Sequence, residues 1–135
     1  MNGGAVIEFS LDGRSGVAPY LQVAQQVRQA LRLGLLREGD QLPTVKDVVA
    51  RLAINPNTVL KAYKELERDG LVAARPGVGT FVTAAPAGVP PAALEPLRRD
   101  LRRWLAKARR AGLDDEAIEA LVANTLRSGG QVGIA

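Results

Sequence analysis

The fold is decided by residues 42–66, which read LPTVKDVVARLAINPNTVLKAYKEL. The apolar residues of this stretch recur at helical spacing in two short runs. Thr44 can cap the first run, and the aspartate three residues later favours a helix N-terminus. Asn55 can cap the second run, with Pro56 at its first position because proline has no N–H to donate. We therefore predict two helices joined by a tight turn over residues 44–69.

The segments before this helix pair predict one strand and one longer helix. Residues 5–11 read AVIEFSL, a β-rich run that predicts a short strand. Pro19 suits the start of a helix, and the apolar residues within 20–36 are spaced for one helix face. The polar stretch at residues 37–40 should end that helix.

The segments after the pair predict a hairpin and two more helices. Residues 71–84 hold two β-rich runs around Pro-Gly-Val-Gly and should form a hairpin, or wing. Residues 85–91 are rich in Ala, Pro and Gly and are interpreted as a linker. Two helices should fill residues 92–127, followed by a flexible tail at 128–135. The expected fold is mostly α with a small β-hairpin, an N-terminal winged helix-turn-helix domain at 1–84 followed by a two-helix C-terminal dimerisation region.

The composition excludes several classes of function. The 135 residues include no histidine and no cysteine, which excludes common zinc sites, disulfides and histidine-based acid–base chemistry. No paired arrangement of other side chains indicates catalysis, so we expect no enzyme and no cofactor. No apolar run is long enough to cross a bilayer, and a cytoplasmic protein is expected. The net charge is +4, divided into +2 over residues 1–84, +5 over 91–110 and −3 over 113–127. This bias alone is weak evidence for nucleic-acid binding.

The predicted order of elements is typical of a winged helix-turn-helix, which places its last helix in the DNA major groove. Asn57 and Thr58 open that helix and can hydrogen-bond to base edges. The lysines that follow them would meet phosphates or guanine, and the glycine turn of the wing lets the backbone approach the minor groove. The candidate DNA-contacting residues from this pattern are Thr44, Lys46, Asn57, Thr58, Lys61, Lys64, Arg75 and Gly77.

Each of these residues also has a purely structural interpretation. Helix capping explains Asn55 and Pro56 as well as DNA contact does. The two lysines could be ordinary solvated side chains. Tyr63 is better explained as a core residue than as a base-stacking aromatic. DNA contact is favoured for Asn57 and Thr58, because a helix tip has no structural need for both.

The run LPTVKDVVARLAINPNTVLKAYKELERDGLVAARPGVGTFV resembles the DNA-binding domain of the GntR family of bacterial transcription regulators. Within it, NPNTVLKAYKELE, together with the two-helix tail, resembles the YtrA subfamily. The resemblance implies a transcription regulator, most often a repressor, that binds double-stranded DNA as a homodimer. It also implies a possible small-molecule effector that releases the DNA.

The resemblance bears on single residues as well. Lys46 matches a position where the family usually has a DNA-contacting arginine, and lysine offers a point charge rather than a bidentate fork. Pro56 and Leu60 stand where many relatives have two further arginines. The similarity therefore implies that Asn55 joins the candidate DNA-contacting residues and shares the base reading with the other polar residues of the helix tip.

The last two predicted helices carry apolar seams that two short helices cannot bury alone. An intramolecular core stripe is one interpretation, and packing against a second subunit is favoured. A two-fold dimer would bind a palindromic operator with half-sites about one helical turn apart. The candidate interface residues are Leu94, Leu97, Leu101, Trp104, Leu105, Ala108, Ile118, Leu121 and Val122.

Two alternatives remain open. The weak charge of residues 1–84 would also suit a winged-helix module that binds proteins and not specific DNA. The regulatory domain of a larger fused enzyme is less favoured.

Overall fold

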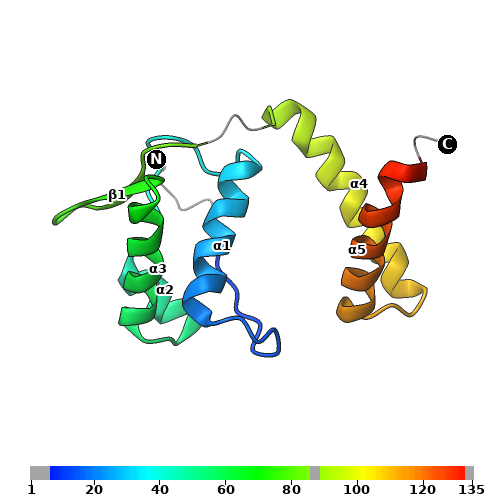
Figure 1. Ribbon diagram of the computed structural model, residues 1–135, viewed down its shortest axis with the longest axis horizontal. Helices are drawn as coiled ribbons and strands as arrows, with labels where there is room; N and C mark the ends of the chain where they lie inside the picture. Colours follow the sequence, from blue (N-terminus) through cyan, green and yellow to red (C-terminus); the bar gives the residue numbers. More distant parts are fainter. Residues whose placement is uncertain (1–6, 86–88, 133–135) are drawn as a thin grey trace. The chain divides into compact units, whose positions relative to one another are not determined.

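The structure is a computed structural model that describes residues 7–85 and 89–132 (Figure 1). This part of the chain contains five helices and one two-stranded antiparallel hairpin, which confirms the mostly helical fold with a small hairpin. The chain divides into two compact units, residues 1–91 and 92–135. In chain order the elements are α1 (Pro19–Arg32), α2 (Val45–Leu52), α3 (Pro56–Arg68), β1 (Val72–Arg75), β2 (Gly79–Val82), α4 (Pro91–Arg110) and α5 (Asp115–Val132).

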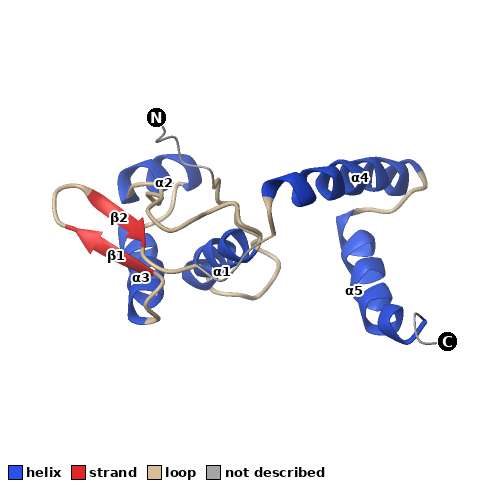
Figure 2. Ribbon diagram, turned by 90° about the horizontal axis from the view of Figure 1, so that it is seen from above, coloured by secondary structure: helices blue, strands red, loops and turns tan. Residues whose placement is uncertain are grey.

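The first unit packs three helices around one apolar core. α1 and α3 lie side by side, α2 packs on α3, and the hairpin follows the end of α3 (Figures 1 and 2). Each buried Val or Leu side chain is worth about 1.5–3 kcal/mol relative to exposure. Burial of these side chains therefore holds the three helices of the first unit together. Its largest fully buried side chains are Val23, Val27, Leu31, Leu36, Leu42, Val59 and Leu66.

The first helix begins at Pro19, as predicted, but ends at Arg32, before the predicted stop at residues 37–40. Gly34 adopts a left-handed φ of 76°, and the N–H of Leu35 donates to the carbonyl of Ala30 at 2.8 Å. These contacts form the C-terminal cap in which a glycine reverses the chain after the last turn. The helical periodicity of the leucines beyond Gly34 is therefore misleading, since they pack as part of a loop.

The predicted strand at residues 5–11 is wrong for the part that the structure describes, which is residues 7–11. Ile7 and Phe9 do point into the core, as alternate residues of an extended chain would. No strand pairs with this segment in the described residues, because side chains of α1 take that role. Gln26 accepts from the N–H of Ser10 at 3.0 Å and donates to the same residue's carbonyl at 2.7 Å. Gln22 likewise binds the N–H and the carbonyl of Asp12, at 2.7 and 3.0 Å.

The hairpin forms where the sequence predicts it, with shorter strands. Its register pairs Val72 with Val82 and Arg75 with Gly79, so Gly79 belongs to β2 and not to the turn. Beyond β2, the N–H of Thr83 still donates to the carbonyl of Leu71 at 2.9 Å. The wing is thereby tied at its base to the end of α3.

The second unit is a pair of helices, α4 and α5. The carboxylate of Asp114 accepts from the N–H of Ala117 at 2.9 Å, which confirms the predicted cap of the second helix. α5 continues to Val132, so the tail predicted from residue 128 is wrong up to that point, and residues 133–135 lie outside the described residues. Gly129 does not adopt the left-handed conformation that would end a helix there.

The predicted linker is shorter than expected because Pro91 already begins α4, and its residues 86–88 are not described.

Candidate nucleic-acid interface

The turn between α2 and α3 sets the start of the third helix. Ala53 ends α2 with a left-handed φ of 55°, an unusual conformation for a residue with a side chain. Asn55 then caps α3, because its side-chain oxygen accepts from the N–H of Asn57 at 2.8 Å. Capping therefore occupies the side-chain oxygen of Asn55, and its side-chain nitrogen is not part of that bond.

The two faces of α3 separate as the sequence predicts. Val59, Ala62, Tyr63 and Leu66 are buried against the core. On the opposite face, Asn57, Leu60, Lys61 and Lys64 are exposed, and Thr58 is half-buried at the edge. Residues three and four apart on a helix are neighbours, so the exposed residues form one continuous row, which we call the α3 outer row: Asn57, Leu60, Lys61 and Lys64.

Lys61 differs from the other members of this row because it contacts a neighbouring helix. Its Nζ lies 4.1 Å from the centroid of the Tyr20 ring, at the first turn of α1. A lysine over an aromatic face is attracted by about 0.5–1 kcal/mol at an exposed site. This contact holds the charge of Lys61 at the α1 side of the α3 outer row.

Tyr63 links α3 to the start of α2. Its hydroxyl donates to the carbonyl of Pro43 at 2.6 Å, and Pro43 directly precedes the cap of α2. Burial raises the pKa of the Tyr63 hydroxyl well above its ordinary value, so the group remains a donor. Tyr63 is thus a core residue that positions the N-terminus of α2 beside α3.

The N-terminus of α2 presents two of the candidate residues. The hydroxyl oxygen of Thr44 accepts from the N–H of Asp47 at 3.1 Å, which leaves the hydroxyl proton for another acceptor. Thr44 and Lys46 are both exposed. A helix N-terminus with exposed amides and a nearby cation is suited to bind a phosphate.

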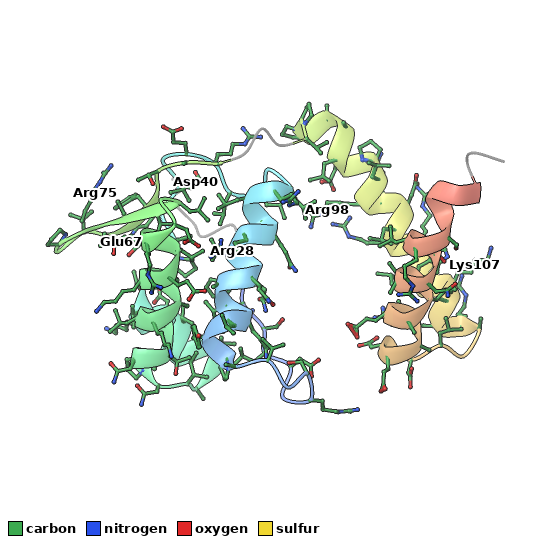
Figure 3. All side chains as sticks on the ribbon, in the orientation of Figure 1. Arg28, Asp40, Glu67, Arg75, Arg98 and Lys107 are labelled. Carbon is green, nitrogen blue, oxygen red and sulfur yellow. The ribbon has the colours of Figure 1, made fainter. Side chains whose placement is uncertain are left out.

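The wing carries Arg75 and Gly77, both exposed near its turn. The guanidinium carbon of Arg75 lies 4.4 Å from the centroid of the Phe81 ring, and its side chain points away from the three helices (Figure 3). Gly77 adopts a left-handed φ of 75°, which glycine tolerates without strain. The tip residue Val78 is 61% exposed, and neither the sequence pattern nor the resemblance indicates a role for it.

Gln41 braces the wing, a role that the sequence does not indicate. Its side-chain nitrogen donates to the carbonyl of Val78 at 3.2 Å. A Cβ on Gly79 would lie 2.3 Å from that nitrogen, so a larger residue there would displace Gln41. The N–H of the next residue, Leu42, donates to the carbonyl of Thr80 at 2.8 Å. These contacts connect the wing to the segment that enters α2.

The charges of the first unit divide into paired and unpaired groups. Arg28 pairs with Asp69, and Arg51 pairs with Glu8 at 2.8 Å. Among the described residues, by contrast, no ion pair involves the candidate cations, which are Lys46, Lys61, Lys64 and Arg75.

The residues 7–85 and 89–132 hold no cluster of acidic side chains suited to a metal ion. Over the same ranges, no helix combines the length and the apolar character that crossing a membrane requires.

The candidate interface residues of α4 and α5 fall into three groups. Ala108 and Ile118 are buried within the chain itself, so they offer little surface to a partner. Leu94, Trp104 and Leu105 are half-buried. The exposed group is Leu97 at 62%, Leu101 at 52%, Leu121 at 43% and Val122 at 39%, and Leu126, outside the predicted set, is the most exposed at 76%.

Comparison with known proteins identifies the family. The profile described as bacterial regulatory proteins, gntR family, matches residues 19–82. The HTH-type transcriptional repressor YtrA of Bacillus subtilis (strain 168) is 33% identical over 111 residues, which cover 82% of this chain and 85% of that protein. The HTH-type transcriptional regulator Rv1152 of Mycobacterium tuberculosis is 38% identical over 73 residues, 54% of this chain and 60% of that protein.

Solved structures share the fold. A crystal structure described as a transcriptional antiterminator from Listeria monocytogenes EGD-e is 29% identical, with a TM-score of 0.56, and the match covers 89% of this chain and 90% of that one. The DNA-binding domain of AraR in complex with operator ORX1 shares the fold at 24% identity and a TM-score of 0.51, over 57% of this chain and 96% of that one. From the relative YtrA above all, we conclude that the chain belongs to the GntR family of bacterial regulatory proteins.

Proposed function

We propose that this protein is a sequence-specific DNA-binding repressor of transcription that binds a palindromic operator as a homodimer. The observation that carries the proposal is the α3 outer row, which starts with an uncharged hydrogen-bonding residue and ends with two lysines. Base edges are read by hydrogen bonds, and phosphates are bound by charge. The order of residues along α3 matches that division.

Each candidate residue has a contact that suits its chemistry. Asn57 can donate and accept at one adenine, and Thr58 can hydrogen-bond to a base or pack on a thymine methyl group. Lys61 and Lys64 would bind phosphates at the edges of the groove. The cap of α2 adds a second phosphate site at Thr44 and Lys46, and the wing adds a third at Arg75 and Gly77. Asn55 would contribute through its side-chain nitrogen, which the capping bond does not use.

The homodimer is supported by the exposed apolar side chains of α4 and α5. Leu97, Leu101 and Leu126 are each more than half exposed. A second copy of the chain would cover them, because a two-fold interface uses the same patch on both subunits. The operator would then hold two half-sites centred about 34–36 Å apart.

We further propose that a small effector binds in the first unit and releases the DNA. An open groove of about 540 Å³ lies in the first unit, between the second half of α1 and the chain that follows β2. Its size is in the range of small-molecule sites. The lining residues are Arg28, Gln29, Leu31, Arg32, Leu71, Ala84 and Ala85. A ligand there should raise the melting temperature of the protein and lower its affinity for the operator, and a library screened by both measurements tests this part.

A selection from random duplexes, followed by a salt titration, tests the proposal as a whole. If Lys46, Lys61, Lys64 and Arg75 of both subunits meet phosphates, the logarithm of the binding constant should fall with the logarithm of salt concentration at a slope of about −7. An enriched palindrome together with a steep slope supports a specific regulator. A winged-helix module that binds proteins would enrich no sequence and bind DNA weakly at every salt concentration.

A further inference from the structure

Leu60 is the single apolar side chain in the α3 outer row. It is 42% exposed, whereas its neighbour Val59 is completely buried. Asn57 lies three positions before Leu60 and Lys64 lies four positions after it, so both neighbours share its helix face. An isolated exposed leucine is common on protein surfaces. This leucine, however, stands in the middle of the surface proposed to enter the major groove.

The packing of the first unit does not require Leu60. α3 reaches the core through Val59, Ala62, Tyr63 and Leu66, and the buried cluster is continuous without Leu60. Alanine has a higher helix propensity than leucine, so helix formation does not require a leucine here either. The side chain is therefore available for a contact outside the subunit.

The chemistry of a leucine limits what it can recognise on DNA. It can neither donate nor accept a hydrogen bond, so it would leave a polar base edge without water or a partner. In the major groove, thymine presents a C5 methyl group beside its O4 acceptor, whereas adenine, guanine and cytosine present hydrogen-bonding atoms and no methyl group. A leucine against a base edge thus favours thymine for two reasons. It makes an apolar contact with the methyl group, and against another base it would cover hydrogen-bonding atoms at a cost in free energy.

We infer that Leu60 reads the C5 methyl group of one thymine in each half-site of the operator. The inference rests on the proposed function and names one element of the sequence that the protein recognises. Asn57 and Lys64 flank Leu60 on the α3 outer row, so this thymine lies between a base bound by Asn57 and a phosphate bound by Lys64.

Replacing thymine by uracil tests the inference on the DNA, without any change to the protein. Uracil keeps every hydrogen-bonding atom of thymine and lacks only the C5 methyl group. The full-length protein is first used to select a sequence from random duplexes, and each thymine of that sequence is then replaced by uracil in turn. One position per half-site should weaken binding about fourfold, the effect of exposing a single buried methyl group.

Two protein variants assign that effect to a side chain. The Leu60→Ala protein should bind the thymine and uracil duplexes of that position equally, because the apolar contact is already lost. Thr58→Ser is the matched control, since it removes one methyl group from the residue two positions before Leu60. It should keep the fourfold effect at the Leu60 position. Circular dichroism checks that both variants fold like the wild type.

The outcomes separate the inference from the proposed function. A selected sequence with no uracil effect overturns the inference and leaves the proposed function standing. The inference is also overturned if every uracil effect persists in Leu60→Ala, or if the effect that Leu60→Ala removes is removed by Thr58→Ser as well. If no sequence is enriched, the proposed function fails, and the inference fails with it.

Discussion

The two units of the chain bury their apolar side chains to different extents. In the first unit, Leu31 and Leu66 are 1% and 0% exposed. In the second, Leu97 and Leu126 are 62% and 76% exposed, and only Ala108 and Ile118 are buried among its described side chains. The first unit therefore completes its own core, while the second carries apolar surface that a partner would cover. The difference fits a molecule in which one unit reads DNA and the other pairs two chains.

The largest effect is expected from a cavity in the first unit. Leu66→Ala should lower the free energy of unfolding by about 2–5 kcal/mol, because Leu66 is fully buried between α3 and the rest of the core. Urea unfolding followed by circular dichroism measures this change. Trp104, the single tryptophan, lies in α4, so its fluorescence reports on the second unit during the same experiment. If the urea midpoint of Leu66→Ala equals that of the wild type, the assigned core is wrong.

The next effect should appear in the second unit and leave the first unchanged. Replacing Leu97 and Leu101 by glutamine removes two apolar contacts per chain and should weaken the dimer by at least about a hundredfold. Sedimentation equilibrium should then show monomers at concentrations where the wild type is a dimer. Glu95→Gln, a change at an exposed polar position of the same helix, is the matched control. A persistent dimer would move the interface to another surface.

A smaller effect concerns base reading by the first unit. The double variant Asn57→Ala/Thr58→Ala should lose about 1–3 kcal/mol of preference for the selected operator per half-site. Its affinity for random duplex should stay the same, since phosphate contacts do not depend on sequence. Competition between the two duplexes measures the preference directly. If the preference is unchanged, these two residues do not read bases.

Tyr63→Phe should lower the free energy of unfolding by about 1 kcal/mol, because the carbonyl of Pro43 loses its donor. The pH dependence gives a second test. The pKa of the Tyr63 hydroxyl is raised in the folded protein, whereas in the unfolded chain the same hydroxyl ionises near pH 10. Ionisation therefore favours the unfolded chain, and this residue makes the wild type lose stability as the pH rises above about 10. The phenylalanine variant should lose less stability over that range. Equal losses in the two proteins would contradict the assigned burial.

The smallest effect is expected at a single phosphate contact. Lys61→Ala should make the salt slope shallower by about one per chain and weaken all DNA sequences alike. Arg32→Ala removes an exposed cation from α1 that is outside the candidate set, and it should leave the slope unchanged. If Lys61→Ala also leaves the slope unchanged, the charge of Lys61 serves only its contact with Tyr20.

The sequence predicts those features that depend on neighbouring residues. The cap at Asn55, the buried face of α3 and the hairpin all follow from local spacing, and the structure confirms them. Features that depend on contacts between residues far apart in the sequence cannot be predicted in this way. The glutamines of α1 replace a strand partner for residues 7–11, and Gln41 braces the wing through a residue 37 positions away. The early end of α1 has a local signal in Gly34, which the leucines around it obscure.

DNA reading by the first unit and pairing of two chains by the second are tested most directly with two duplexes, one with a single half-site and one with the full palindrome. The Leu97→Gln/Leu101→Gln protein should bind the single half-site as tightly as a wild-type subunit does. It should also lose the additional affinity that the wild type gains on the palindrome. Loss of half-site binding, or a full palindrome gain in this variant, would contradict the account.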